Sequence, residues 1–120
     1  MEETASTNSD CLVAAYRRSR QALDQASRQT AGKGSRGRDW VSVDGNLYAS
    51  LLLIDPGPRE KLAGLTLLQR LRCVKRLLNL QETPNALRDI SLKWPNDVLV
   101  SGKKVSGILL SAMKLTARRW

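Results

Sequence analysis

The chain has 120 residues and a formal net charge of +9, with 42% hydrophobic residues but no His and no Phe. Without an imidazole it cannot form a Ser-His-Asp or Cys-His triad, a His-ligated zinc site or a His general base. Its length and apolar fraction suit one small globular domain. Any chemistry must therefore use Lys, Arg, Asp, backbone amides or a metal ion bound with the substrate.

The cysteines and the amino terminus indicate a cytoplasmic protein. Cys11 and Cys73 lack Cys-x-x-Cys spacing and read as buried, reduced thiols. The first residues are acidic and polar, and no stretch approaches the roughly 18 apolar residues of a membrane span. We therefore expect no secretory leader and no membrane contact.

The amino-terminal third predicts a helix and then a loop. Ser, Thr and Asn side chains that could cap a helix precede Cys11, and Leu12, Tyr16 and Leu23 recur at helical spacing, which predicts a helix over about residues 9–25. Residues 29–40 have three glycines between polar and basic residues and no periodicity, so they predict a loop.

The rest of the chain predicts a strand, a long helix and three further strands. Residues 46–54 predict a strand whose last four apolar residues indicate burial on both faces. A helix is predicted from Pro58 to about Leu80, with these apolar positions at helical spacing: Leu62, Leu65, Leu68, Leu71, Val74 and Leu78. Residues 90–94 predict a strand, and residues 98–100 and 105–110 predict a hairpin around a Gly-containing turn. This order predicts an α+β fold with helices on one side of the sheet.

Positive charge is dense in the amino-terminal third. Seven Lys and Arg residues lie between Arg17 and Arg38, against Asp24 as the one acid. Residues 32–38, here called the cationic loop, combine three glycines with Lys33, Arg36 and Arg38, so backbone N–H groups and full charges can surround an anion. The spacing is not that of a Walker A loop. It leaves phosphate binding and an RGG-like RNA contact both open.

Two further segments carry candidate chemistry. Lys93-Trp-Pro-Asn-Asp97 ends a strand with two polar residues, and Asp97 could hold Mg²⁺ beside substrate phosphates. An isolated Asn-Asp pair is more often an Asx-turn. A lysine on a hairpin, such as Lys104, is ordinarily an exposed charge. It becomes a candidate site residue only if it lies close to the other two segments.

Five blocks in the same order resemble the catalytic domain of biotin protein ligases, the biotin–[acetyl-CoA-carboxylase] ligase family. The matching blocks are residues 6–8, 29–40, 45–50, 93–97 and 102–109. The resemblance implies a mixed, mainly antiparallel α+β sheet with helices on one side, as in class II aminoacyl-tRNA synthetases. It also implies ATP-dependent conversion of biotin to biotinyl-5′-AMP, followed by transfer to a lysine of a biotin carboxyl carrier protein.

The resemblance also implies roles for individual residues. Lys104 and Asp97 would be catalytic, with Lys104 contacting the biotin carboxylate and Asp97 lying near Mg²⁺. The remaining biotin-binding residues would be Ser6, Thr7, Asn8, Gln29, Lys33, Gly34 and Ser35. The ATP and adenylate would meet Arg36, Arg38, Trp40, Asn96 and Asp97.

The chain departs from the family pattern in three places. Lys33 and Ser35 stand where well-known members have Arg in the loop Gly-Arg-Gly-Arg-Arg-Gly-Arg, which would weaken retention of the adenylate. Residues 16–24 continue the predicted helix where the family has a turn and a short strand. The pattern ends near residue 110, so we expect a partial catalytic domain over residues 1–110 and a non-matching tail over residues 111–120.

We expect such a truncated domain to adenylate biotin poorly, and its uncovered sheet edge could pair with a second copy. No helix-turn-helix region precedes Ser6, so we expect no repressor activity. The alternatives are a basic nucleic-acid-binding module, which would lack stacking aromatics between Arg17 and Arg38, and a non-catalytic remnant of the fold. We expect no specific nucleic-acid partner.

Overall fold

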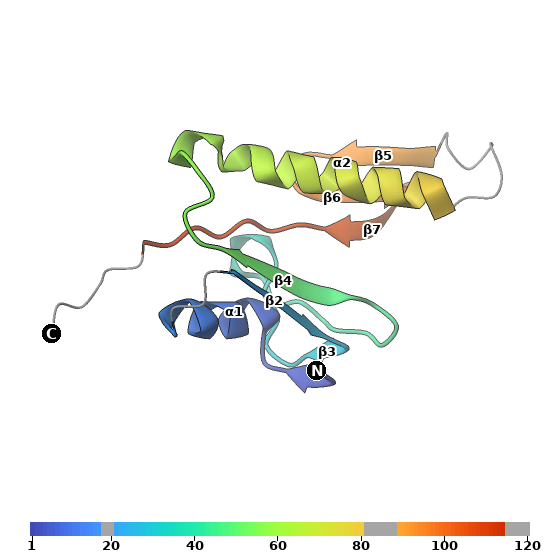
Figure 1. The fold of residues 1–120 in the computed structure, drawn as a ribbon. Coiled ribbons are helices and arrows are strands. Elements are labelled where there is room, and N and C mark those ends of the chain that lie inside the picture. Colours follow the sequence, from blue (N-terminus) through green and yellow to red (C-terminus); the bar gives the residue numbers. More distant parts are fainter. Residues whose placement is uncertain (18–20, 81–88, 115–120) are drawn as a thin grey trace, which may run out of the picture. The chain divides into compact units, whose positions relative to one another are not determined.

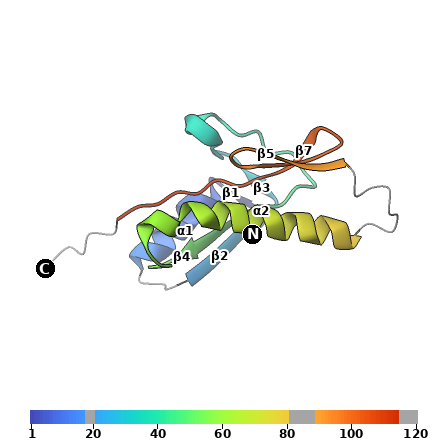
Figure 2. The same cartoon turned by 90° about the horizontal axis from the view of Figure 1, so that it is seen from above.

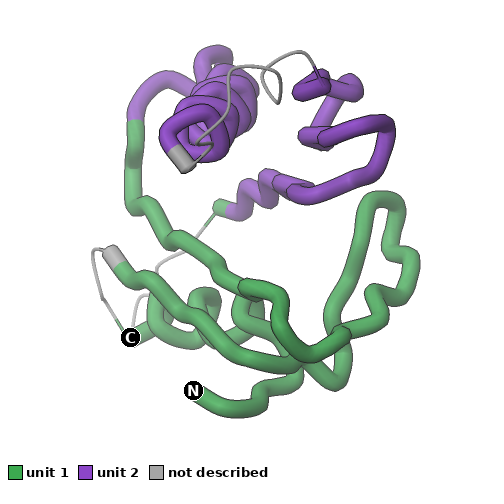
Figure 3. Tube along the Cα trace, turned by 90° about the vertical axis from the view of Figure 1, so that its right-hand side faces the viewer, with its two compact units in different colours: residues 1–56, 114–120 green, residues 57–113 purple. Residues whose placement is uncertain are grey.

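The computed structural model describes residues 1–17, 21–80 and 89–114. The chain divides into unit 1, residues 1–56 with 114–120, and unit 2, residues 57–113 (Figure 3).

Unit 1 is built on a two-stranded antiparallel sheet with one helix against it. Strand β2 (Gln21–Ala26) pairs with β4 (Tyr48–Leu53), and helix α1 (Thr7–Tyr16) contacts both strands (Figures 1 and 2). The core between them holds these buried side chains: Cys11, Ala15, Ala26 and Tyr48. Helix and strands thereby bury one face of the small sheet.

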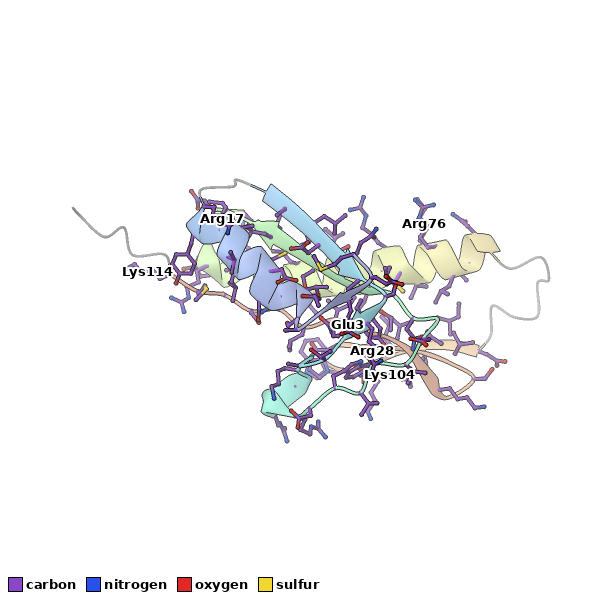
Figure 4. The ribbon with its side chains drawn as sticks, turned by 90° about the horizontal axis from the view of Figure 1, so that it is seen from below. Glu3, Arg17, Arg28, Arg76, Lys104 and Lys114 are labelled. Atoms are coloured by element: carbon purple, nitrogen blue, oxygen red, sulfur yellow. The ribbon has the colours of Figure 1, made fainter. Side chains whose placement is uncertain are left out.

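Two very short strands tie the amino terminus to the loop that follows β2. Strand β1 (Glu3–Thr4) pairs in parallel with β3 (Arg28–Gln29), and Glu3 forms an ion pair with Arg28 at 3.7 Å (Figure 4). The backbone N–H groups of Thr30 and Ala31 extend this pairing by donating to the carbonyls of Thr4 and Ala5. Strands of two residues carry no periodicity, so the sequence does not predict them.

The predicted helix over residues 9–25 is wrong in its second half. Helix α1 ends at Tyr16, and residues 21–26 form β2, paired with β4 along its whole length. Gln, Ala and Leu are good helix formers, but helix propensity is a small term, and pairing with a neighbouring strand overrides it here. A strand is therefore present before Gln29, as in the family pattern, whereas residues 18–20 lie outside the described residues.

The predicted strand at residues 46–54 is confirmed as β4, but burial on both of its faces is wrong. Tyr48 is buried, whereas Leu51 and Leu53 are 46% and 38% exposed. Only the face that meets α1 is covered within unit 1, so β4 alternates as a strand with a single buried face does.

Unit 2 pairs a long helix with a three-stranded antiparallel sheet. A short 3₁₀ turn (η2, Arg59–Lys61) leads into helix α2 (Ala63–Leu80), which contacts β6. The strands β5 (Ile90–Lys93), β6 (Asp97–Val100) and β7 (Lys103–Gly107) lie in that order in the sheet (Figure 1). Val98 at the centre of β6 is fully buried. The predicted helix is confirmed, although it begins at Ala63 and not at Pro58, and the strand after it is confirmed as β5. The hairpin is confirmed with its second strand at Lys103–Gly107 in place of the predicted residues 105–110.

The buried face of α2 differs from the predicted one. Arg70 is only 2% exposed, and its guanidinium lies 5.5 Å from the centre of the Trp94 ring. Leu68 and Leu71, predicted on the buried face, are 52% and 50% exposed. The helix is rotated so that Arg70 and Val74 lie on its more buried side, while Arg76 projects outward (Figure 4).

Taken together, the described helices and mainly antiparallel strands confirm the α+β fold class. Within the described residues, neither α1 nor α2 has the length and apolarity needed to cross a membrane.

Candidate biotin and adenylate site

The start of α1 holds the side chain of Gln29 in place. Ser6 is the N-cap of the helix, and its hydroxyl accepts a bond from the Ser9 N–H at 3.4 Å. Gln29 Oε1 accepts two hydrogen bonds from Thr7, one from its backbone N–H (2.9 Å) and one from its hydroxyl (3.0 Å). Thr7 is 3% exposed, so this contact is shielded from water.

Ser50 on β4 completes this network. Its hydroxyl lies 2.8 Å from the Thr7 hydroxyl. A hydroxyl carries one proton, and because that of Thr7 goes to Gln29, the Ser50 hydroxyl must donate to Thr7. The Ser50 carbonyl also accepts a bond from the Cys11 thiol at 3.3 Å. Ser50 thus connects β4, α1 and Gln29. This role was not predicted, because Thr7 and Ser50 are 43 residues apart in the sequence.

The amino end of the Gln29 carboxamide packs against Gly32. A Cβ atom at Gly32 would lie 2.8 Å from Gln29 Nε2 and 3.4 Å from Trp40 Cβ, so any other residue would push the carboxamide away. The backbone N–H of Gln29 donates to the Ser42 hydroxyl at 3.1 Å. Thr7 and Gly32 therefore hold the two ends of this carboxamide.

The cationic loop is closed by its own backbone. The Gly34 N–H donates to the Arg38 carbonyl at 2.6 Å, and the Trp40 N–H donates to the Gly32 carbonyl at 2.9 Å. Arg36 and Gly37 have φ angles of +60° and +71°, which turn the chain sharply at the tip of the loop. This geometry leaves the Arg36 and Arg38 side chains exposed, although Arg38 Nε also donates to the Ser35 carbonyl at 3.3 Å.

Lys33 has an acidic partner in the structure. Its ammonium contacts the Asp39 carboxylate at 2.5 Å, across a bridge that joins the two sides of the loop. The hydrogen bond and the charge of Lys33 lower the pKa of the Asp39 carboxyl below its ordinary value. The positive charge at position 33 is thus already balanced, whereas Arg36 and Arg38 take part in none of the ion pairs among the described residues.

Trp40 lies at the base of the loop. A Cβ at Gly34 would lie 3.5 Å from Trp40 Cε3, so the indole rests in ordinary van der Waals contact with the loop backbone. The residue is 42% exposed and leaves aromatic surface available. An exposed indole beside cations is a suitable stacking surface for a nucleobase.

In unit 2, Asp97 on β6 and Lys104 on β7 form an ion pair. Lys104 Nζ lies 2.9 Å from Asp97 Oδ1, with the two side chains 38% and 23% exposed. Figure 4 marks Lys104. Since both groups remain partly solvated, they can exchange this contact for one with a ligand at modest cost.

A β-bulge brings this pair onto one face of the sheet. The register pairs Asp97 with Gly107 and Val98 with Ser106, and then skips Val105 to pair Leu99 with Lys104. In a regular ladder Lys104 would pair with Val100, and its side chain would lie on the face of the sheet opposite to that of Asp97. Because the bulge shifts the alternation by one residue, Lys104 shares a face with Asp97.

The residues around Asp97 fit a Mg²⁺ ion that arrives with its own ligands. Asp97 would offer one carboxylate and Asn96 an amide oxygen, which are donor types that Mg²⁺ prefers. The described residues contain no group of three or more His, Cys, Asp or Glu that could enclose a metal. An ion here would therefore depend on substrate phosphates for further oxygen ligands.

The predicted site residues thus fall into two groups. Thr7, Gln29, the cationic loop and Trp40 belong to unit 1, whereas Asn96, Asp97 and Lys104 belong to unit 2. Ser6 and Asn8 flank Thr7 at the start of α1. The convergence of the two groups on one ligand stays a prediction.

Two surface depressions in unit 1 lie away from these residues. One, of about 380 Å³, is lined by residues such as Gln25 and Asn46, and the other, of about 510 Å³, by residues such as Glu2 and Asp44. Neither is lined by a predicted site residue.

Comparison with known proteins decides the family. The signature of the biotin/lipoate A/B protein ligase family matches residues 4–117. The chain belongs to this family. It is 39% identical over 112 residues to the biotin–[acetyl-CoA-carboxylase] ligase of Paracoccus denitrificans, covering 93% of this chain and 45% of that protein.

Solved structures agree with this assignment. The biotin protein ligase of Leishmania major in complex with biotin superposes with a TM-score of 0.79 at 29% identity, over 95% of this chain and 50% of that one. The same enzyme in complex with biotinyl-5-AMP gives a TM-score of 0.74 at 29% identity, over 93% and 50%. The chain therefore has the biotin-ligase fold and spans about half the length of these relatives.

Two of the basic residues between Arg17 and Arg38 form ion pairs with acidic side chains. Arg28 is paired with Glu3, and Lys33 is paired with Asp39. Arg18 and Arg20 lie outside the described residues.

Proposed function

We propose that this chain binds biotin and ATP and takes part in the ATP-dependent attachment of biotin to a lysine of a carboxylase carrier domain. The observation that carries this proposal is the Gln29 carboxamide, held by Thr7 and Gly32 at the foot of the cationic loop. The family membership and the likeness to a ligase in complex with biotinyl-5-AMP support it.

The chemistry needs few groups from the protein. A biotin carboxylate oxygen attacks the α-phosphorus of ATP, the bond to the β-phosphate oxygen breaks, and pyrophosphate leaves. The amine of the carrier lysine then attacks the carbonyl carbon of the mixed anhydride, and AMP leaves. Both steps depend on positioning and on neutralising charge, which Lys, Arg and backbone amides provide without histidine.

In this proposal the groups of unit 1 bind the ligand. Ser6, Thr7 and Asn8 border the biotin site, and Gln29 hydrogen-bonds the polar head of biotin. Lys33, Gly34 and Ser35 lie over the ligand, while Arg36 and Arg38 neutralise phosphate and Trp40 stacks beside the adenine.

The groups of unit 2 act at the reacting atoms. Lys104 contacts the biotin carboxylate and the developing charge on phosphorus, and Asn96 and Asp97 lie near the phosphates. A Mg²⁺ ion, when bound at Asp97, would neutralise phosphate charge. We further propose that residues 1–110 form the ligase-like part and that the reaction is cytoplasmic, where ATP is available.

Ligand-induced stabilisation tests this proposal directly. The melting temperature of the chain should rise with biotin and rise further with biotin and ATP together, because ligands that bind only the folded chain stabilise it. Lipoate at the same concentration should give a smaller shift. Pyrophosphate release and biotinyl-AMP recovered from the protein measure activation.

A matched pair of lysines supplies the control. Lys104→Ala should lose the response to biotin, whereas Lys61→Ala, an exposed lysine of η2, should retain it. If biotin and ATP leave the melting temperature of the unsubstituted chain unchanged, the proposal is wrong. An equal loss in both variants would contradict the role of Lys104.

A further inference from the structure

Gly107 lies directly across the hairpin from Asp97, with the side chain of Lys104 between them. The register pairs Gly107 with Asp97, and the bulge at Val105 places Lys104 on the same face. A Cβ atom at Gly107 would lie 2.8 Å from Lys104 Cε and 2.9 Å from Lys104 Nζ. It would also lie 3.6 Å from Asp97 Oδ1.

We propose that Gly107 is a positioning residue, whose missing side chain leaves the space in which the Lys104 ammonium rests against Asp97. This inference deepens the proposed function and relies on it for the ligand that Lys104 would meet. Lys104 Nζ lies 2.9 Å from Asp97 Oδ1, and the same space that holds this nitrogen is the space a Cβ would fill. Glycine is thus required at position 107 because the Lys104 side chain occupies the space of a Cβ atom.

Backbone conformation does not explain this glycine. The glycines with positive φ are Gly37, Gly45, Gly57 and Gly102, and Gly107 is not among them. Alanine can therefore adopt the Gly107 backbone without strain. The atoms it would displace are the far end of a flexible lysine, which can swing aside at little cost to the fold.

The same geometry explains why Lys104 and not Lys103 is paired with Asp97. Lys103 lies opposite Val100, whereas Lys104 lies opposite Leu99, two residues along β6 from Asp97 and on the same face. The long aliphatic stem of Lys104 can then run over Gly107 to reach the carboxylate. Lys103 is therefore an internal control within the same hairpin.

Competitive labelling of lysines by acetic anhydride, read by mass spectrometry, tests the position of Lys104 without any ligand. In Gly107→Ala, acetylation of Lys104 relative to Lys103 should rise by about twofold to fivefold, as expected when a partly exposed ion pair is lost. Gly64→Ala is the matched control, because a Cβ at Gly64 meets nothing within 4 Å. It should leave the Lys104 to Lys103 ratio unchanged.

A double-mutant cycle separates the ion pair from other effects. In an Asp97→Asn background the ion pair between Lys104 and Asp97 is already lost, so Gly107→Ala should add little further acetylation. An unchanged Lys104 ratio in Gly107→Ala, or an equal rise with and without Asp97, would overturn the proposal. A melting temperature measured on each variant shows that the chain remains folded, and if Gly107→Ala does not fold, Gly107→Ser replaces it.

Biotin titration then connects this position to function. Gly107→Ala should weaken biotin binding in the same direction as Lys104→Ala, and Gly64→Ala should not. Suppose that Lys104→Ala weakens biotin binding, and that Gly107→Ala raises the acetylation of Lys104 but leaves biotin affinity unchanged. The positioning role of Gly107 is then wrong. If the unsubstituted chain does not bind biotin, the proposed function fails, while the labelling result still decides the effect of Gly107 on Lys104.

Discussion

Replacement of Thr7 by valine should both destabilise unit 1 and weaken biotin binding. Valine keeps the shape of threonine but removes the hydroxyl that donates to Gln29 at 3.0 Å and contacts Ser50 at 2.8 Å. Each such bond contributes about 0.5–1.5 kcal/mol, so the loss of both amounts to about 1–3 kcal/mol. Thr7 is 3% exposed, and water cannot easily replace the lost partner.

Urea unfolding followed by circular dichroism measures this loss. With an m value of about 1–3 kcal/mol per molar urea, the midpoint should fall by roughly 1 M. Biotin affinity should fall as well, because Gln29 Oε1 keeps only the bond from the Thr7 N–H. Thr30→Val is the matched control, since Thr30 is exposed. The reasoning is refuted if the two variants lose equal stability.

Three further outcomes are expected. The pKa of the Asp39 carboxyl is lowered by Lys33, so the ion pair should persist above the ordinary value of 3.8 and be lost as pH falls through the lower folded value. Carbon-detected NMR should follow this titration, and Lys33→Gln should return the pKa to its ordinary value. Burial raises the pKa of the Cys11 thiol above 9.0. The neutral thiol therefore contributes its full stability to the folded chain below pH 9.0, and this contribution is lost as the pH rises through the folded pKa. Iodoacetamide should accordingly modify Cys73 before Cys11, and equal rates in the folded chain would contradict this. Finally, β7 is an edge strand of the described sheet and Val105 is 52% exposed, so the chain should associate with itself as concentration rises and Val105→Lys should reduce this association in sedimentation velocity. A chain that remains monomeric at every concentration would show that the edge does not pair.

The sequence was sufficient wherever one local signal dominated. Helix α2 and strand β4 carry clear apolar patterns, and the hairpin of β6 and β7 surrounds a Gly-containing turn, so the type of each element was predicted, although the start of α2 and the bounds of β7 were not. The family blocks also predicted which residues would carry chemistry. These features depend on neighbours a few positions away along the chain.

Other features needed contacts between distant residues. Strand β2 has the composition of a helix and becomes a strand because β4 pairs with it. The side of α2 that faces β6 includes Arg70, since packing against the sheet and the Trp94 ring set the rotation of the helix. Neither outcome could be read from periodicity alone.

Residue types, turn chemistry and the order of the blocks were enough to assign this chain to a ligase family and to name Gln29, Asp97 and Lys104 as candidates, because these signals are local. Only the tertiary structure showed that Thr7 and Ser50 orient Gln29, and that a bulge at Val105 on β7 brings Lys104 onto the same face as Asp97. Hydrogen-bond partners and strand register are set when distant segments meet, and a one-residue shift in register moves a side chain to the other face of a sheet.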